Sequence, residues 1–539
     1  MIQKDGLATL ARRFDTSLAN VHEYLKENAN LIFALAAVAL CAYGFELFQL
    51  NLTVDEELHA EYLGPTLGWV SQGRWGMYLL NKFILPYTVI PFTPLFIALI
   101  FHIAAVLLML EGWKITSKLE RFIVGAICVA FPTMAYMYTF STISYGIGIG
   151  LFCSALSLFF YARNSGWKRY LTILPASFAI AIYQGFLPVL AALFLVYMIR
   201  TQIHSEKPIL FDIIAIASIL IISLFIYYAI QNLIFIIGVV PELAYVSDFI
   251  DVGFLQRYFS TVLRRIWSYA FLPVYLGDEG IYSINLRSLA FLLFVSFLGL
   301  FIHLVKSRRS LTNWLFVISL LLLLSISPFL SGFLMQGYMS LRFLVALPVV
   351  ISGIVMLGML GSSRSFKLVT ALLATYCIFQ FVTSTNHLFA SSHLAFEADR
   401  ILATRLITRI EDAQGEANTQ EVRYIEIIGY YSRPATNLIP KIETFGASFF
   451  EVGQGIPGRI ASFLGIAGFE RLQEVSVDRR AELVAIADSM PTWPDKGSIK
   501  VVEDIVLIKL GLYSDAQKML ICSSKQSRSH LYDKSFCRP

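Results

Sequence analysis

Ten long apolar runs, almost free of charged side chains, constrain the fold of this chain more than any other feature of its sequence. Each run can cross a hydrocarbon core about 30 Å thick, which takes about 20 helical residues. They begin near Leu31, Thr88, Phe122, Ile143, Leu171, Ile213, Ser288, Leu311, Phe343 and Leu368. Of the 539 residues, 57% are hydrophobic and 15% are charged. The sequence therefore predicts a polytopic α-helical membrane protein.

Short basic loops between the runs predict the topology. They span Lys114 to Arg121, Arg163 to Arg169, Arg200 to Lys207, Lys306 to Arg309 and Arg364 to Lys367. Lys/Arg-rich short loops mark the cytoplasmic side of a membrane. The net charge of +5 is spread over these loops and forms no dense basic block, so nucleic acid is excluded as an expected partner.

The run from Leu171 to Ile199 is too long for one crossing and has basic loops at both ends. About 29 helical residues would extend over roughly 43 Å. A break at Tyr183-Gln184-Gly185, with Pro175 and Pro188 bending the two arms, keeps both basic loops inside and gives about eleven hydrophobic segments. Broken membrane helices are tolerated where protein or a watery cavity satisfies the freed backbone groups. We therefore expect Tyr183 and Gln184 to line a cavity.

This topology divides the chain into three parts. Residues 1–29 predict an amphipathic segment on the cytoplasmic surface. Residues 30–386 form the transmembrane domain, with outer loops at 51–87 and 238–287. Residues 387–539 have an ordinary composition, with a helical pattern at 388–410, a β-rich run at 422–431 and alternating strands at 499–502 and 505–509, which predict an outer α/β domain. Cys522 and Cys537 of this domain are candidates for a disulfide.

Three adjacent carboxylates, Asp55, Glu56 and Glu57, follow the first run at the outer surface. Ionised groups at the mouth of a helix bundle predict a functional site. Thr53 and Glu56 also match a capping box, which would make Glu56 the start of an outward helix. Asp55 shares a helical face with His59 and is the better candidate for a general base.

Two arginines are candidates for binding a phosphate near these carboxylates. Arg74 and Trp75 follow in the same outer loop, and Arg342 begins a later run. Arginine matches phosphate bidentately, and an indole offers a flat surface to a sugar or a lipid headgroup. The alternatives are an interfacial anchor for Arg74, an aromatic belt for Trp75 and a snorkelling side chain for Arg342. Asp278 and Glu279 form a rival acidic pair that glycines on either side mark as an ordinary turn. No His/Cys/carboxylate spacing indicates a metal site.

A combination of short motifs carries a resemblance to a known family. It comprises the acidic pair at Asp55, Gly73-Arg74-Trp75, the break at Tyr183, and two C-terminal segments, Gly446 to Phe450 and Met490 to Ser498. In this order they resemble the Gtr-type II glucosyltransferases of bacterial O-antigen modification, over nearly the whole chain. Such proteins are similar to GT-C glycosyltransferases, which carry the catalytic carboxylate in the first outer loop.

The resemblance implies an inverting transfer of glucose from undecaprenyl-phosphate glucose to O antigen of lipopolysaccharide. The reaction would take place on the periplasmic face of the bacterial inner membrane, without a cofactor. Asp55 or Glu56 would be the base. Glu57, His59, Arg74, Trp75, Tyr183, Gln184 and Arg342 would contribute to substrate binding. The lipid bilayer is an expected partner, and a donor flippase and a donor synthase are further candidates.

Two other classes remain open from the sequence alone. A broken helix with polar residues is familiar in transporters, although the large outer domain and the outer carboxylates fit that class poorly. A glycan polymerase or ligase that uses a lipid-diphosphate donor shares both the membrane class and the outward site. A donor assay separates it from a lipid-monophosphate-dependent transferase.

Overall fold

The computed structural model describes residues 19, 22–60, 67–85, 89–204, 210–238, 240, 252–307, 310–334, 337–417, 422–469 and 472–523. Most of residues 1–29 lie outside these ranges, as does Cys537, so the expected amphipathic segment is described only in part. Residues 22–27 are helical. Cys522 is disulfide-bonded.

Ten helices among the described residues are long and apolar enough to cross a membrane. They are α2 (Ala29–Phe48), α6 (Thr93–Gly112), α7 with its short extension (Lys118–Tyr138), α9 (Ser144–Arg163), α11 (Phe186–His204), α12 (Leu210–Ile236), α17 (Arg287–Lys306), α18 with α19 (Leu311–Phe333), α20 with its preceding 3-10 turn (Leu341–Met359), and the first part of α21 (Arg364–Ala417). The prediction of a polytopic helical membrane protein is confirmed.

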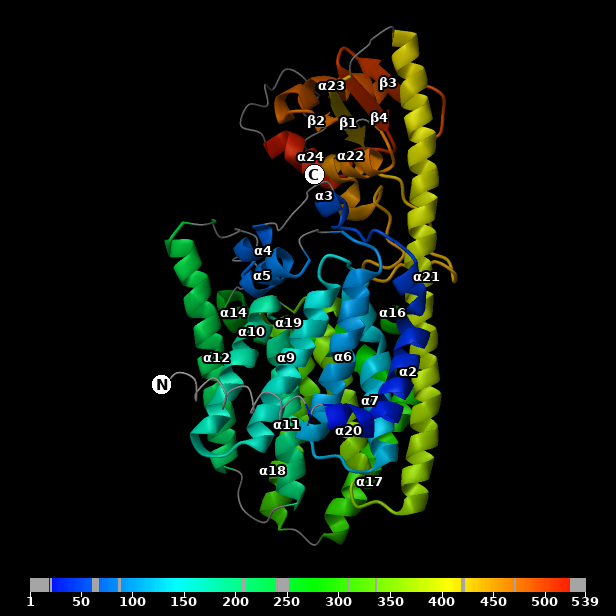
Figure 1. Ribbon diagram of the computed structural model, residues 1–539. Helices are drawn as coiled ribbons and strands as arrows, with labels where there is room; N and C mark the ends of the chain where they lie inside the picture. Colours follow the sequence, from blue (N-terminus) through cyan, green and yellow to red (C-terminus); the bar gives the residue numbers. More distant parts are fainter. Residues whose placement is uncertain are drawn as a thin grey trace.

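The two ends of the bundle differ in character (Figure 1). At one end lie the short helices that follow α2, namely α3 (Glu57–Ala60), α4 (Gly68–Ser71) and α5 (Trp75–Phe83), together with the C-terminal domain. The basic loops gather at the other end, where Arg200 donates to the Lys114 carbonyl over 2.8 Å and Lys367 pairs with Glu120. We call the first the outer end and the second the basic end.

The expected helix break is present. Helix α10 (Ile173–Ile182) stops at Tyr183, which is extended at φ −158° and ψ 125°, and α11 begins at Phe186. Pro188 is the third residue of α11, where the backbone N–H that proline lacks has no helical partner to lose. Pro175 is the third residue of α10, which continues directly from a 3-10 helix at Gly166–Thr172.

Helix α21 is a single helix of 54 residues that leaves the bundle and continues along the C-terminal domain (Figure 1). Such a helix is about 81 Å long. It passes through the boundary expected at residues 386 and 387, since the stretch holds no proline and its one glycine, Gly415, lies near the end.

The C-terminal domain is built on a four-stranded mixed sheet in the order β2-β1-β4-β3. Its strands are β1 (Tyr424–Ile428), β2 (Gln473–Glu474), β3 (Ile499–Val502) and β4 (Ile505–Lys509). Strand β1 runs parallel to β2 and β4, and β3 pairs antiparallel with β4. Helices α22 (Pro457–Ile466), α23 (Val477–Ser489) and α24 (Asp515–Ser523) complete the domain. The predicted α/β character and three of the strands are confirmed.

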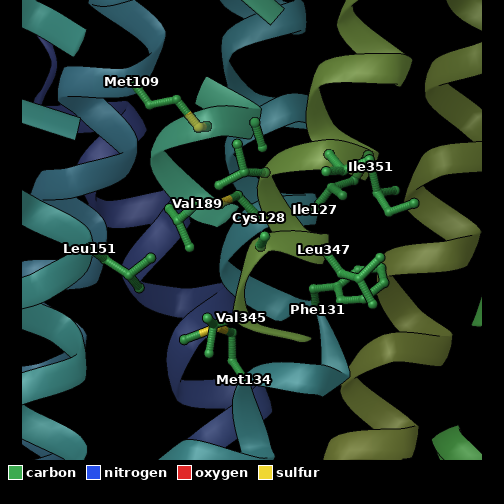
Figure 2. Close-up of a cluster of buried hydrophobic side chains, with 14 of the residues drawn as sticks. Met109, Ile127, Cys128, Phe131, Met134, Leu151, Val189, Val345, Leu347 and Ile351 are labelled. Atoms are coloured by element: carbon green, nitrogen blue, oxygen red, sulfur yellow. The ribbon is translucent and has the colours of Figure 1, made fainter. Parts of the chain in front are cut away.

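The bundle core is apolar and closely packed. Figure 2 shows part of it, where Met109, Cys128, Val189 and Ile351 meet from four different helices. Small residues let the helices approach: a Cβ added to Gly148 of α9 would lie 2.5 Å from the carbonyl oxygen of Ala98 in α6. Small residues at such contacts are typical of membrane helix pairs, where backbones approach closely.

Gly148→Ala is expected to lower the melting temperature of the detergent-solubilised protein, because the added methyl group meets backbone that cannot rotate away. Overpacking of this kind costs about 1–3 kcal/mol. Gly44→Ala in α2 is the matched control, since its Cβ would find no atom within 4 Å. The packing argument fails if the two variants melt alike by tryptophan fluorescence.

Candidate active site

The outer-end loop between α2 and α3 presents Asp55 in an unusual backbone conformation. Asp55 has φ +94°, a region that side-chain-bearing residues rarely adopt. Its N–H donates to Glu57 Oε2 over 2.7 Å, which holds the turn. The side chain of Asp55 is 45% exposed, whereas that of Glu57 is fully buried. Strained backbone of this kind is concentrated at functional sites.

Two arginines from distant parts of the chain converge on Asp55. Arg459, in the first turn of α22, donates from Nη2 to Asp55 Oδ1 over 2.5 Å and from Nη1 to Glu57 Oε1 over 2.8 Å. Arg342 donates from Nη1 to Asp55 Oδ2 over 3.5 Å. One guanidinium therefore bridges two carboxylates, and a second contacts the other oxygen of Asp55.

Arg342 is held in place by the C-terminal domain. Its Nε donates to Glu443 Oε1 over 2.8 Å, and Glu443 also accepts from Ser340 Oγ and the Leu341 N–H. The guanidinium lies 5.5 Å from the centre of the Phe140 ring. Arg342 thus belongs to the carboxylate cluster, and these contacts disfavour the alternative that it only snorkels towards the interface.

Glu56 faces away from this cluster and ties the loop to the bundle. It is 1% exposed. Its carboxylate accepts from the Thr53 N–H, the Ser141 hydroxyl and the Thr142 N–H, at 3.1, 2.9 and 3.0 Å. Burial raises the pKa of this carboxyl to about 7, against the opposing effect of those hydrogen bonds. Only half of the capping box expected for Thr53 and Glu56 forms. Glu56 accepts from the Thr53 N–H, whereas the Thr53 hydroxyl bonds Thr139 and the Glu56 N–H donates to the Thr53 carbonyl.

A second cluster surrounds Arg74. Its guanidinium lies 5.6 Å from the Trp69 ring and 5.1 Å from the Tyr183 ring. Gln184 donates from Nε2 to the Gln72 carbonyl over 3.0 Å and to the Tyr227 hydroxyl over 3.1 Å. The break between α10 and α11 is therefore hydrogen-bonded to the loop that carries Arg74. The buried Arg74 Nε has no hydrogen-bond partner among the described residues.

Tyr183 joins the two clusters. Its ring stacks on Phe343, with centroids 6.1 Å apart and planes 3° apart, and its hydroxyl donates to the Arg342 carbonyl over 3.4 Å. Tyr183 is 4% exposed. Trp75 begins α5, and its indole lies against Phe178. His59 belongs to α3, but its side chain lies outside those that the structure describes.

Other candidates are assigned to plainer roles. Asp278 accepts from the Gly280 N–H over 2.8 Å at the start of α16 (Glu279–Tyr282), as the turn interpretation predicts. Within the described ranges, no group of three or more His, Cys, Asp or Glu side chains is arranged to hold a metal ion.

Comparison with known proteins assigns the family. A family model described as glucosyl transferase GtrII matches residues 44–359, which is more than half of the chain. The chain belongs to this family. It is therefore a glycosyltransferase, as the motif resemblance predicted. No curated protein and no solved structure matches the chain.

The matched stretch of this GtrII member contains Asp55, Arg74, Tyr183 and Arg342 but ends before Glu443 and Arg459. Nothing in the local sequence around Glu443 or Arg459 marks either as a site residue. Their contacts with residues 341–342 and 55–57 span about 100 and 400 positions, and local pattern does not reveal such pairs.

Glu56→Gln is expected to retain most transfer activity, because the Glu56 carboxylate is fully engaged by the loop. Its effect is on stability and depends on pH. The folded pKa of about 7 lies above the unfolded value of 4.5, so the folded protein holds the extra proton between these values. Wild type should gain stability relative to the variant as pH falls from 7 to 4.5, by up to about 3 kcal/mol.

Melting temperatures of both proteins between pH 4.5 and 8.5 test this. A constant difference across the range contradicts the titration of Glu56. Transfer lost as completely as in an Asp55 variant contradicts its assignment to the loop rather than to catalysis.

Proposed function

We propose that this GtrII-family protein transfers glucose from undecaprenyl-phosphate glucose to a hydroxyl of the lipopolysaccharide O antigen, with inversion at the anomeric carbon. The proposal rests above all on one observation: Asp55 is a partly exposed carboxylate held beside two arginines at the outer end of a membrane bundle. A base, cations for a phosphate and access from water lie in one place.

Asp55 is the proposed general base. A base must reach the acceptor hydroxyl at about 2.6–3.2 Å. Of the three adjacent carboxylates, Glu56 and Glu57 are buried, with 1% and 0% of the residue exposed. Asp55 alone among them offers a side chain with water access, so it is the one that an incoming sugar hydroxyl reaches.

The reaction is a single displacement. The acceptor oxygen forms its bond to C1 of the glucosyl group while the bond from C1 to the phosphate oxygen breaks, and that electron pair leaves with the phosphate. Asp55 takes the proton of the acceptor hydroxyl. Arg342 stabilises the charge that grows on the phosphate, and such electrostatic stabilisation is commonly the largest contribution to catalysis. Arg74, on the other side of Tyr183, is the proposed second cation for the donor.

The outer end is the proposed periplasmic end. This orientation follows from the basic loops, which gather at the opposite end and mark the cytoplasmic side. It places Asp55 and the C-terminal domain with the O antigen, and it lets a lipid-linked donor approach from the bilayer. Because an undecaprenyl chain is a lipid, the donor needs no soluble carrier.

Asp55→Asn is expected to lower the rate of transfer by about 10²–10⁴-fold, the usual contribution of a general base. The assay follows radiolabelled glucose from synthetic undecaprenyl-phosphate glucose into purified O antigen. Asp278→Asn is the matched control, because it makes the same change in another outer loop, where Asp278 only begins a short helix.

Normal transfer by Asp55→Asn would exclude Asp55 as the base. Transfer from undecaprenyl-diphosphate-linked sugar, with none from the monophosphate donor, would instead favour a polymerase or ligase. NMR of the product linkage tests inversion, since a single in-line displacement reverses the configuration at C1.

A further inference from the structure

Arg459 reaches the membrane-domain site from outside the stretch that defines the family. It is the third residue of α22, and α22 packs against α3 of the first outer loop. Its side chain is only 18% exposed, and its Nη1 and Nη2 are directed at Glu57 and Asp55. The C-terminal domain thus supplies the cation nearest to the proposed base.

The cluster around Asp55 has more negative than positive groups, although it is proposed to bind an anionic phosphate. Asp55, Glu57 and Glu443 supply three carboxylates, whereas Arg342 and Arg459 supply two guanidinium groups. Both cations are engaged by acids, so the phosphate of a donor must compete for one of them. Meanwhile Arg459 Nη2 lies 2.5 Å from Asp55 Oδ1 and covers an oxygen that a general base needs open.

One rearrangement meets both requirements. Resting on the function proposed above, we propose that Arg459 binds the phosphate of the lipid-linked donor, and that this draws Nη2 away from Asp55 and opens the carboxylate to the acceptor hydroxyl. The C-terminal domain then couples donor binding to the availability of the base.

The geometry makes this exchange a small movement. Glu57 is fully buried and accepts from both Arg459 Nη1 and the Asp55 N–H, so it anchors the arginine and the loop together. Rotation of the guanidinium about the bond to Glu57 moves Nη2 without displacing α22. Arg342 stays in place because Glu443 holds its Nε.

Phosphate also competes better as the reaction proceeds. The donor is a phosphodiester with one negative charge, and the leaving lipid phosphate is a monoester that gains a second charge. Guanidinium groups match phosphate oxygens bidentately. An interaction that strengthens towards the transition state raises kcat as well as affinity.

The first test measures binding of undecaprenyl phosphate to the full-length, detergent-solubilised protein, with undecaprenol as the neutral lipid. Arg459→Gln is made together with Glu57→Gln, so that no buried carboxylate loses its counter-charge. This double variant should bind undecaprenyl phosphate about 10–100-fold more weakly than Glu57→Gln alone, from the loss of a charged hydrogen bond, with undecaprenol unchanged.

Two further variants keep this test specific. Arg479→Gln removes the same charge from the same domain at a partly exposed pair with Asp504, and should bind as wild type does. Arg459→Lys keeps the cation without the planar fork, and should recover part of the affinity. Equal affinity of Glu57→Gln and the double variant for undecaprenyl phosphate would overturn the proposal.

The second test asks whether phosphate separates Arg459 from Asp55. A double-mutant cycle of Asp55→Asn and Arg459→Gln, in the Glu57→Gln background, gives their coupling as non-additivity in melting temperature. Coupling should be present with saturating undecaprenol and lost with saturating undecaprenyl phosphate. Coupling that persists unchanged with the phosphate would refute the exchange. Neither test requires turnover. Normal transfer by Asp55→Asn would therefore exclude Asp55 as the base without changing what these two tests say about Arg459.

Discussion

The bridge that Arg459 makes between Asp55 and Glu57 is the contact on which the outer end of this protein depends. It joins a loop of the membrane domain to a helix of the C-terminal domain across 404 positions of sequence. A second bridge, from Arg342 to Glu443, repeats the pattern with the donor and acceptor domains reversed. Each domain therefore contributes one guanidinium group that binds a carboxylate of the other domain. A buried charge without a partner is strongly destabilising, so each domain needs the other to neutralise the charged groups that it contributes.

The membrane fold was largely predictable, because the physics that fixes it is local. An apolar run of a given length has few alternatives to a spanning helix, and flanking Lys and Arg decide its direction. Even the break at Tyr183 followed from length and charge alone. The 54 residues of α21 were harder to delimit, since hydropathy changes near residue 387 while helix propensity does not. Hydropathy locates the membrane surface, but a helix ends only where its backbone is interrupted.

The site was predictable in its residue types but not in its pairings. Asp55, Arg74 and Arg342 were candidates because charged side chains at the ends of membrane-spanning runs are costly and commonly mark functional sites. The proposal of Asp55 rather than Glu56 as the base rests on the structure, in which the Glu56 carboxylate bonds residues 141 and 142 and Asp55 stays partly exposed. Arg459 and Glu443 could not be assigned to the site, because what brings them there is the docking of a separate domain. Pairs of this kind are set by tertiary packing, and a single sequence carries no record of them.

The position of Asp55 explains why its loop is strained rather than regular. A helix continued from Thr53 would carry Asp55 with φ near −60°, whereas the positive φ gives its N–H to Glu57 and brings its carboxylate to the arginines. The cost of that conformation, about 1–3 kcal/mol, is sustained only where surrounding contacts over-determine it. Here those contacts are the three hydrogen bonds to Glu56 on one side and the Arg459 bridge on the other. Glu56 thus keeps the loop fixed to the bundle, so in the proposed exchange the guanidinium of Arg459 moves and the loop does not.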